Sequence, residues 1–518
     1  MITFLLALYW LAAAGLCIYG LNCHVLCAAF RRGRTAGLAR LAALRATWEA
    51  QTPADALPVV TVQLPIYNER YVVQRLLRAV VAFDWPADRL QIQVLDDSTD
   101  DTSAIAAALC AELVAQGHDI QHVRRLNREG YKAGALRDAL PDARGDLIAI
   151  FDADFVPAPD FLRRMVPLLG DPATGLAQAR WGHLNRHSSA LTRAQALAID
   201  GHFAIEQAGR CWAGWLLNFN GTAGIWRRQA IEDAGGWQAD TLTEDLDLSY
   251  RAQLVGWKVE YAFDTEVPAE IPADISAFRS QQRRWAKGSI QTARKLLPRV
   301  LTSRLPLLTR CQAVLHLTHY LVHPLMLAVV LLAVPVLFFA GDSGLPPAAI
   351  AVLATLLALG TTGPTALYVA GQRALRRDGP GHLRDLPLLM LLGTGIAVSN
   401  TRAVFEALLG MESEFVRTPK RNLKDGSRVQ AGGGYRIPVD ALCLIEAALA
   451  LWSALGITLY VERGSWLIGP FLALNALSFA WVAALSLRER SAQRRRPALE
   501  VSAPEAAATE AVLQNPAA

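Results

Sequence analysis

Two carboxylates stand two positions apart directly after a strongly apolar run. Asp152 and Asp154 follow LIAIF at 147–151, and alternate residues of an extended turn can aim both side chains at one point. Without compensation the two charges would repel, and one carboxyl would bind a proton. A divalent cation removes that conflict; hard oxygen ligands suit Mg²⁺ or Mn²⁺, which can also stabilise a diphosphate leaving group. A surface turn is the alternative, but such a pair at the end of a buried strand is rarer.

Two other acidic groups could also do chemistry, one after a predicted strand and one after the glycine-rich stretch at 235–237. Asp96 and Asp97 come after QIQVL, where they could accept hydrogen bonds from a ribose or a base, or cap the next helix. The loop after the preceding apolar run contains Tyr67 and Glu69 and suits a nucleotide. In TED at 243–245, the acids could support the first turn of a helix, or one carboxylate could act as general base toward a hydroxyl group.

A basic and aromatic group, QQRRW at 281–285, lies in an amphipathic stretch beside an apolar segment. Arginine and tryptophan at this place could form only an interfacial anchor. Alternatively, Arg284 neutralises a diphosphate and Trp285 stacks against a sugar ring.

An α/β domain is needed to bring these groups together. Short apolar runs alternate with helical stretches between residues 58 and 272, which favours a mainly parallel sheet that binds ligands at the carboxyl ends of its strands. We predict strands at 58–64, 91–95, 146–151, 175–180 and 258–262, and helices at 69–82, 103–116, 132–140, 190–209 and 243–255.

Apolar segments flank this domain. Hydrophobic residues make up 53% of the chain and the mean hydropathy is +0.23, and ~20 apolar residues suffice to cross a bilayer as a helix. We predict one transmembrane helix at 1–30, two in 313–370 and two in 439–487. The basic linker at 31–57 follows the first helix, so the positive-inside rule places the linker and the α/β domain at 58–272 in the cytoplasm.

The run at 384–410 is predicted to be interfacial or re-entrant, because Arg402 and Glu406 are costly inside a bilayer. If this run crossed, the basic loop at 411–438 and the tail at 488–518 would both lie outside, against the positive-inside rule. A second interfacial helix, which carries the QQRRW group, is predicted at 273–300. The tail has no periodicity and is expected to be disordered.

Polar residues also occur within the apolar segments. His316, His319 and His323 have helical spacing and could bind a metal, although we favour a polar side that faces other protein or a channel. Glu446 could line a channel or lie near the cytoplasmic boundary.

The net charge of +5 comes from clusters beside apolar runs, which favours the lipid bilayer over nucleic acid as a partner. The seven cysteines include no CxxC pair, so neither a zinc site nor a disulfide framework is indicated.

As an ordered set, the motifs resemble those of the processive family-2 glycosyltransferases, such as cellulose and hyaluronan synthases. The signature D, DxD, (T/E)ED and QxxRW occurs here as Asp97, 152–154, 243–245 and 281–285. The sequences around these motifs most resemble those of plant mannan and glucomannan synthase-like enzymes and their bacterial relatives. Examples are VQLPIYNER (62–70), REGYKAGAL (128–136) and NFNGTAGIWR (218–227). Cellulose synthases usually have cysteine at the position of Asn220, which argues against a cellulose assignment.

The segment at 415–420, FVRTPK, resembles the FxVTxK gating loop of cellulose synthases, which closes over bound nucleotide. It matches at Phe415, Thr418 and Lys420 but has Arg417 where that family has valine. A basic juxtamembrane loop is the alternative interpretation.

The resemblance implies a GT-A-like (Rossmann-like) cytoplasmic domain inserted between transmembrane α-helices of a polytopic membrane protein. It also implies the roles of individual residues. Asp245 would be the catalytic base, and Asp152 and Asp154 would hold Mg²⁺ or Mn²⁺. The nucleotide-sugar would be bound by Asp97, Asp96, Tyr67, Glu69, Lys132, Asp152 and Arg284. The acceptor would be bound by Gln281, Trp285, Asn220, Gly221, Thr222 and Glu244.

The predicted function is therefore an inverting hexosyltransferase of the cell (inner) membrane. Its donor would be GDP-mannose or UDP-glucose, and its acceptor a growing β-linked glycan that it also exports. The alternatives are a lipid glycosyltransferase that adds one sugar to ceramide or diacylglycerol, a nucleotide-sensing transporter or scaffold, and a hydrolase. A hydrolase is disfavoured because residues two apart suit one metal better than opposite faces of a sugar. Linkage, accessory subunits and oligomeric state stay open.

Overall fold

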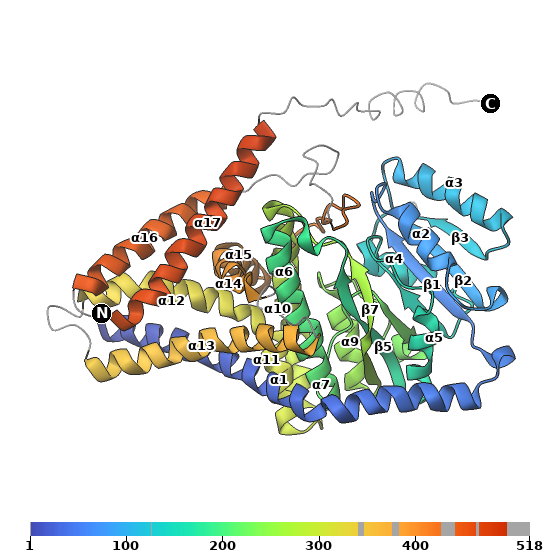
Figure 1. Ribbon diagram of the computed structural model, residues 1–518, viewed down its shortest axis with the longest axis horizontal. Helices are drawn as coiled ribbons and strands as arrows, with labels where there is room; N and C mark the ends of the chain where they lie inside the picture. The colour runs from blue at the N-terminus through green and yellow to red at the C-terminus, as the bar shows by residue number, and fades with distance from the viewer. Residues whose placement is uncertain are drawn as a thin grey trace.

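The computed structural model describes residues 2–125, 127–339, 346–375, 383–425, 441–462 and 466–494. It has a sheet domain at one end and a bundle of apolar helices at the other, with the long helix α1 passing along both (Figure 1). The predicted loop at 411–438 is described only to residue 425, and the predicted tail only to residue 494.

Seven strands form one mixed sheet in the order β3-β2-β1-β4-β6-β5-β7. Their neighbours pair in parallel except around β6, which runs antiparallel to both β4 and β5. The prediction of a mainly parallel sheet therefore holds, and β3 and β6 are the two strands that it missed. The bounds are β1 Val60–Ile66, β2 Leu90–Asp96, β3 Ile120–Arg124, β4 Leu147–Ile150, β5 Thr174–His183, β6 Gly224–Arg227 and β7 Lys258–Ala269.

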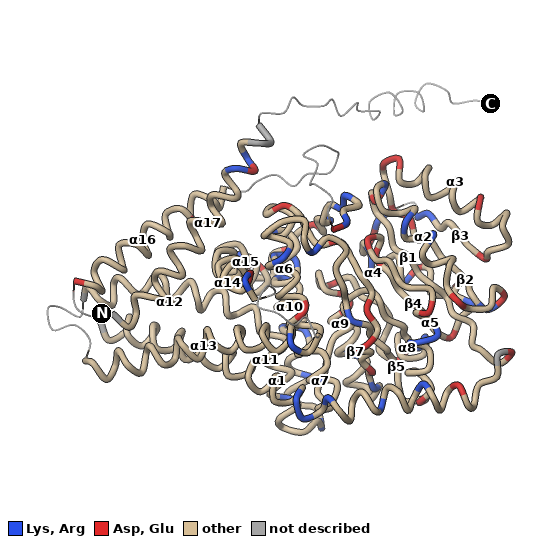
Figure 2. Tube along the Cα trace, viewed as in Figure 1, with Lys and Arg blue, Asp and Glu red and all other residues tan. Residues whose placement is uncertain are grey.

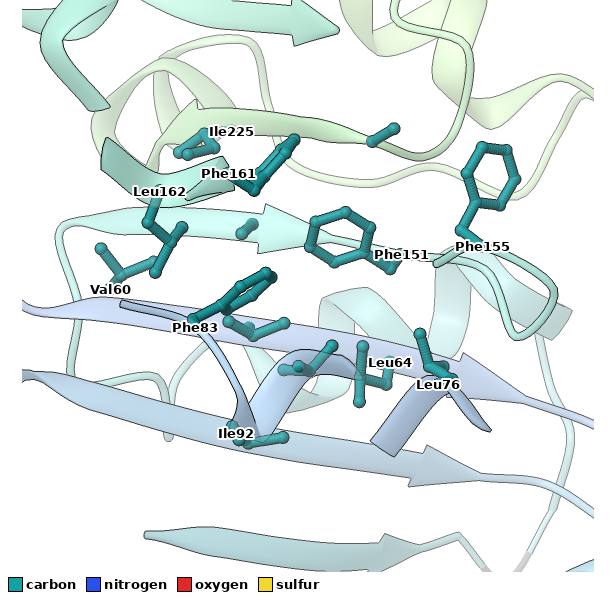
Figure 3. Packing of buried hydrophobic residues seen from close by; sticks show 14 of the residues in the cluster. Val60, Leu64, Leu76, Phe83, Ile92, Phe151, Phe155, Phe161, Leu162 and Ile225 are labelled. Atoms are coloured by element: carbon teal, nitrogen blue, oxygen red, sulfur yellow. The ribbon is translucent and has the colours of Figure 1, made fainter. Parts of the chain in front are cut away.

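Helices cover both faces of the sheet and exclude water from it. The helix α2 (Val73–Val81) buries Val73, Leu76, Leu77 and Val80, which share one face at helical spacing. Figure 3 shows how the core under β1 and β4 is filled by Phe83, Phe151 and Phe161, so the strand ends that carry the acidic groups are rigidly supported. The other helices of the domain are α3 Thr102–Ala115, α4 Tyr131–Ala139, α5 Phe161–Met165, α8 Arg228–Asp233 and α9 Glu244–Leu254.

The predicted helix at 190–209 occurs in three parts. Ala190–Gly201 forms α6, His202–Gln207 forms a π-helical turn, and Ala208–Trp212 forms α7. The residues expected as a linker at 31–57 are helical up to Gln51, because α1 (Ile2–Gln51) continues without a break from the apolar run. This half of α1 packs under the sheet domain, where Arg45 donates to the carboxylate of Asp264 at 2.6 Å.

Five helices among the described residues are long and apolar enough to cross a membrane. They are α1, the stretch His319–Phe338 that includes α12 (Val322–Phe339), α13 (Pro347–Ala374), α16 (Leu442–Glu462) and α17 (Gly469–Arg494). Figure 2 shows that the traces of α12, α13 and α16 carry few charges, in contrast to the sheet domain. These helices fit a polytopic membrane protein.

The run predicted to be interfacial or re-entrant forms α14 (Leu386–Gly395) and α15 (Ala397–Leu408). The two helices meet at a 44° bend, a geometry that a broken span and a re-entrant segment share. The second predicted interfacial helix is α10, which extends over Ile275–Thr302.

The three histidines do not lie on one continuous helix. α11 (Leu307–Leu317) ends before a 3₁₀ turn at His319–Leu321, and α12 begins after it. His316 lies 2.7 Å from the hydroxyl of Tyr250 and His323 lies 2.9 Å from the amide of Asn400. His316 and His323 therefore contact other protein, one of the two surroundings that we favoured for this polar side from the sequence.

Candidate active site

A cavity of about 170 Å³ lies at the carboxyl ends of β1, β2 and β4. Its other walls come from α9, from α10 and from the loop at 411–425. The cavity brings together sixteen of the eighteen residues that the sequence analysis singled out for binding, catalysis or gating. They are Tyr67, Glu69, Asp97, Lys132, Asp152, Asp154, Asn220, Gly221, Glu244, Asp245, Gln281, Arg284, Trp285, Phe415, Thr418 and Lys420.

Asp97 is held at the cavity wall by Arg125. The guanidinium donates two parallel hydrogen bonds to the carboxylate, with Nε–Oδ1 at 2.9 Å and Nη2–Oδ2 at 2.5 Å, the strong bidentate geometry of an arginine–carboxylate pair. Beside it, the guanidinium of Arg128 lies over the ring of Tyr67 at 3.4 Å. This corner of the cavity thus presents a fixed carboxylate and a flat cationic surface.

The prediction that Asp96 binds the nucleotide-sugar is not supported by its position. Its side chain points into the domain, where it lies 2.8 Å from His122 and accepts a hydrogen bond from the backbone of Ser98. Burial alone would raise the pKa of Asp96, but these hydrogen bonds lower it to about 2. Successive residues of a strand point to opposite faces, so only Asp97 reaches the cavity.

Each aspartate of the pair at 152–154 contacts a lysine. Asp152 is bonded to the ammonium of Lys132, which also donates to the carbonyl of Gly221 at 2.9 Å. Asp154 accepts from Lys420 of the 411–425 loop at 2.7 Å. Each carboxylate is therefore paired with the ammonium group of a lysine, as expected where negative charge attracts cations.

The two carboxylates suit a metal ion that is bound partly by the protein and partly by a substrate. Within the described residues, no cluster of three or more His, Cys, Asp or Glu side chains has the arrangement of a complete metal site. Two carboxylates beside an open cavity match Mg²⁺ or Mn²⁺, which use one or two protein carboxylates and complete their shell with phosphate oxygens and water.

The loop at 220–222 supports the aspartates. Asn220 lines the cavity, and its amide oxygen accepts from Gln207 at 2.6 Å. Gly221 has a φ of +79°, and a β-carbon at this position would lie 2.9 Å from Oδ2 of Asp245. Thr222 was expected to bind the acceptor, but it is fully buried behind the cavity, and its hydroxyl accepts from the backbone N–H of Asp152 at 2.9 Å.

Asp245 lies in the first turn of α9 and lines the cavity. Burial, together with the negative charge of Glu244, raises the pKa of Asp245 to about 7, although Lys132 acts in the opposite direction. A carboxylate whose pKa lies near neutrality can accept a proton from a hydroxyl group and release it again. The helix α9 therefore presents to the cavity a carboxylate that is suited to act as a general base.

α10 supplies the opposite wall with Gln281, Arg284 and Trp285. The guanidinium of Arg284 lies 4.6 Å from the ring centre of Phe415, a cation–π distance that connects α10 with the loop. Phe415 also packs against Tyr131 at 5.7 Å between ring centres.

The loop at 411–425 is inserted into the cavity by ionic contacts. Arg417 pairs with Glu69 at 2.6 Å, and Lys420 pairs with Asp154. Burial raises the pKa of Glu69 to about 7, against the opposing effect of Arg417. Because these side chains fill one wall, the cavity is smaller than the roughly 300–1,000 Å³ typical of ligand sites.

Comparison with known proteins agrees with this geometry. The family described as "Glycosyltransferase like family 2" matches residues 58–288. Residues 58–288 are a family 2 glycosyltransferase domain. The chain is 44% identical over 252 residues to glucomannan 4-β-mannosyltransferase 2 of Arabidopsis thaliana and 43% identical over 255 residues to glucomannan 4-β-mannosyltransferase 1 of Oryza sativa. Each match covers 48% of this chain, and the chain spans about half the length of these curated relatives.

Solved structures are more distant. The chain resembles the mannosyltransferase PcManGT from Pyrobaculum calidifontis, described in complex with GDP-Man and Mn²⁺, with a TM-score of 0.45, 23% identity and coverage of 77% of this chain and all of that one. A structure of Staphylococcus aureus TarS (residues 1–349) with UDP-GlcNAc matches with a TM-score of 0.36 and 13% identity, over 62% of this chain and 92% of the other. The mixed sheet of the glycosyltransferase domain is GT-A-like.

Two cavity residues, and one residue that holds Asp97 at the cavity wall, escaped the sequence analysis. Arg125, Arg128 and Glu270 were not singled out, since isolated charged residues lack a motif. Glu270 is buried, and it accepts from the backbone N–H groups of Arg421 and Leu423 at 2.8 and 3.2 Å. A signal existed for Arg128 alone, which opens the REGYKAGAL segment.

Proposed function

We propose that this protein is a membrane glycosyltransferase that builds a β-linked mannan or glucomannan from a nucleotide-activated sugar. The observation that carries the proposal is that all four motif groups line a single cavity. The similarity of the domain to glucomannan 4-β-mannosyltransferases supports mannose as the transferred sugar and GDP-mannose as the donor, with UDP-glucose as the competing donor.

The donor would lie along the strand ends. Asp97, fixed by Arg125, is suited to accept hydrogen bonds from the ribose or base, and the Arg128–Tyr67 pair offers a flat surface for the base. Lys132 and Arg284 would balance the charge of the diphosphate. Asp152 and Asp154 would hold the divalent cation, which would stabilise the negative charge that develops on the leaving diphosphate.

Transfer would occur in a single displacement. The acceptor hydroxyl gives its proton to the carboxylate of Asp245, and its oxygen forms the new bond to the anomeric carbon. The bond from that carbon to the diphosphate oxygen breaks at the same time, and the diphosphate keeps the electron pair. Attack from the face opposite the leaving group inverts the configuration, so an α-linked donor yields a β-linkage. Gln281 and Trp285 would hold the end of the acceptor.

Export of the product is supported by a second cavity between the membrane helices. This cavity of about 340 Å³ is lined by residues of α1, α12, α13 and α17 and by the π-helical turn. Asn220 of the first cavity lies 3.2 Å from His202, which lies 2.9 Å from Glu206. His202 and Glu206 both line the second cavity, so polar groups join the two. With the catalytic domain in the cytoplasm, the glycan would leave across the membrane along this route.

The proposal is tested by incubating membranes that contain the protein with radiolabelled GDP-mannose or UDP-glucose and Mg²⁺ or Mn²⁺. We expect GDP-mannose to yield a high-molecular-mass product that an endo-β-mannanase degrades. A single labelled glycolipid extracted into organic solvent would instead identify a lipid glycosyltransferase. Linkage analysis of the product then separates mannan from glucomannan, and Asp245→Asn serves as the inactive control.

A further inference from the structure

The helix that carries the 281–285 group has a second, basic face. Arg279, Arg283 and Lys287 follow one another at intervals of four on α10, so they share one side of the helix. This side does not form the cavity wall; its cations pair with carboxylates of helices from the membrane part. The same helix therefore contacts the acceptor site on one side and the membrane helices on the other.

The first pair joins α10 to α16. Arg279 donates from Nη2 to both carboxylate oxygens of Glu446, whose side chain is fully buried. This contact assigns Glu446 a place in an ion pair, where the sequence left channel lining and boundary position open.

Glu406 of α15 accepts hydrogen bonds from three cations. Arg283 donates to Oε1 at 2.6 Å, Arg402 donates to the same oxygen at 2.9 Å, and Lys287 lies 3.5 Å from Oε2. Lys287 is only 2% exposed. A buried ammonium requires a nearby carboxylate, because water cannot stabilise its charge.

Lys287 connects this cluster to the loop at 411–425. Its ammonium also donates to the hydroxyl of Ser413 at 2.9 Å, at the point where the loop leaves α15. Near the other end of the loop, Arg421 pairs with Asp274 beside the first residue of α10 at 2.5 Å. The loop is thus attached at both ends to the helix that bears Trp285.

We propose that Glu406 is a positioning residue that couples α10 to closure of the loop at 411–425 through Lys287. The proposal rests on the proposed function, in which α10 binds the acceptor and the loop covers the donor. With Glu406 ionised, Lys287 is held between α15 and Ser413, and the loop stays inserted. Without that charge, the Lys287 ammonium loses its carboxylate, moves toward water and releases Ser413.

The first test follows loop closure without any sugar transfer. Glu406→Gln is compared with Glu412→Gln, which removes the same charge from an exposed position one residue before Ser413. Trypsin cleavage after Arg417 and Lys420 is measured by mass spectrometry in the full-length protein in lipid nanodiscs. We expect Glu406→Gln to be cleaved about tenfold faster than wild type and Glu412→Gln at the wild-type rate. Equal cleavage rates in the two variants would overturn the proposal, whatever the outcome of the transfer assay.

The second test separates coupling from a plain counter-ion role. Glu406→Gln/Lys287→Met removes both buried charges, so we expect its Tm to recover most of the loss seen in Glu406→Gln. Arg283 and Arg402 also lose their carboxylate, but both side chains are partly exposed and can reach water. We expect the KM for the donor to be about tenfold above wild type in Glu406→Gln and in the double variant alike, with kcat nearly unchanged, because the link to Ser413 is absent in both. Recovery of both Tm and KM would mean that Glu406 only neutralises Lys287, and the coupling would be refuted.

Discussion

Asp245 and Glu69 both have a pKa raised to about 7, but their surroundings differ. Glu69 is paired with Arg417, whereas the carboxylate of Asp245 faces the cavity beside Glu244. A raised pKa therefore has a different meaning at each position. At Glu69 it reflects burial of a partner for the loop, and at Asp245 it would set the pH at which the proposed general base becomes competent.

The pH dependence of transfer should report Asp245. Because the carboxylate must be free to accept a proton, we expect kcat/KM to fall about tenfold per pH unit below about pH 7 and to level off above it. Asp245→Asn should reduce transfer by about 10²–10⁴-fold. Asp240→Asn is the matched control, since Asp240 is exposed and contacts Lys295 outside the cavity. A profile that stays flat from pH 5 to pH 8 would exclude Asp245 as the base.

The same pKa predicts that Asp245→Asn stabilises the protein. The native carboxyl keeps its proton up to about pH 7, while the unfolded one releases it near 3.8. The native state thus binds more protons in this window, and stability falls as pH rises. We expect the variant to exceed the wild-type Tm by about 2 °C or more at pH 8 and by little at pH 4. A Tm difference that is independent of pH would contradict the assignment.

Single residues were predictable where a motif coincided with a strand end. Asp97, Asp152 and Asp154 were found in this way. Asp96 was assigned to the cavity because its side-chain direction depends on strand register, which the sequence pattern did not resolve. Arg125 was missed because its pairing with Asp97 spans 28 positions and is created only by the fold.

At the scale of elements, predictability followed length and apolarity. The apolar runs that became β1, β2 and β4 were recognised. β6 is as short as β4 but begins with Gly224 and ends with Arg227, and β3 is partly exposed. The break between α6 and α7 at the π-helical turn could not be recognised from the spacing of apolar residues in the sequence. The loop at 411–425 was found through its motif, but the partners of its cations depend on how it folds over the sheet.

The loop should compete with the divalent cation for Asp154. The ammonium of Lys420 lies 2.7 Å from Oδ2 of Asp154, and a cation bound there would be repelled by it. Without donor, we expect Lys420→Met to bind Mn²⁺ several-fold more tightly than wild type, as measured by electron paramagnetic resonance. Lys424→Met removes the same charge from an exposed part of the loop and should leave the affinity unchanged. Weaker Mn²⁺ binding in Lys420→Met would show that the lysine assists the metal.

At the scale of the whole molecule, the distribution of charge along the sequence predicted more of the helix arrangement than the periodicity of apolar residues did. The uncharged runs located the helices α1, α12, α13, α16 and α17, and the run at 384–410, which the charges set apart, is a bent pair of helices. The continuation of α1 beneath the sheet domain was not predicted, because its basic residues suggested a linker. Arg40 and Arg45 instead form ion pairs with Glu260 and Asp264, and thereby fix the domain relative to the membrane helices.

The close approach of α1 to α7 should be essential to this arrangement. A β-carbon on Gly37 would lie 2.4 Å from the indole ring of Trp212, so Gly37→Ala must push the two helices apart. We expect a loss of about 1–3 kcal/mol, since overpacking has this cost in a filled interior, and a fall in both Tm and transfer rate. Trp212→Leu in the same chain should restore much of the loss by making space.

Gly393→Ala is the matched control for Gly37→Ala, because a β-carbon at Gly393 on α14 meets no atom within 4 Å. It should leave the Tm unchanged or raise it slightly, as alanine favours the helix over glycine. If Gly37→Ala behaved like this control, α1 would not be packed against Trp212.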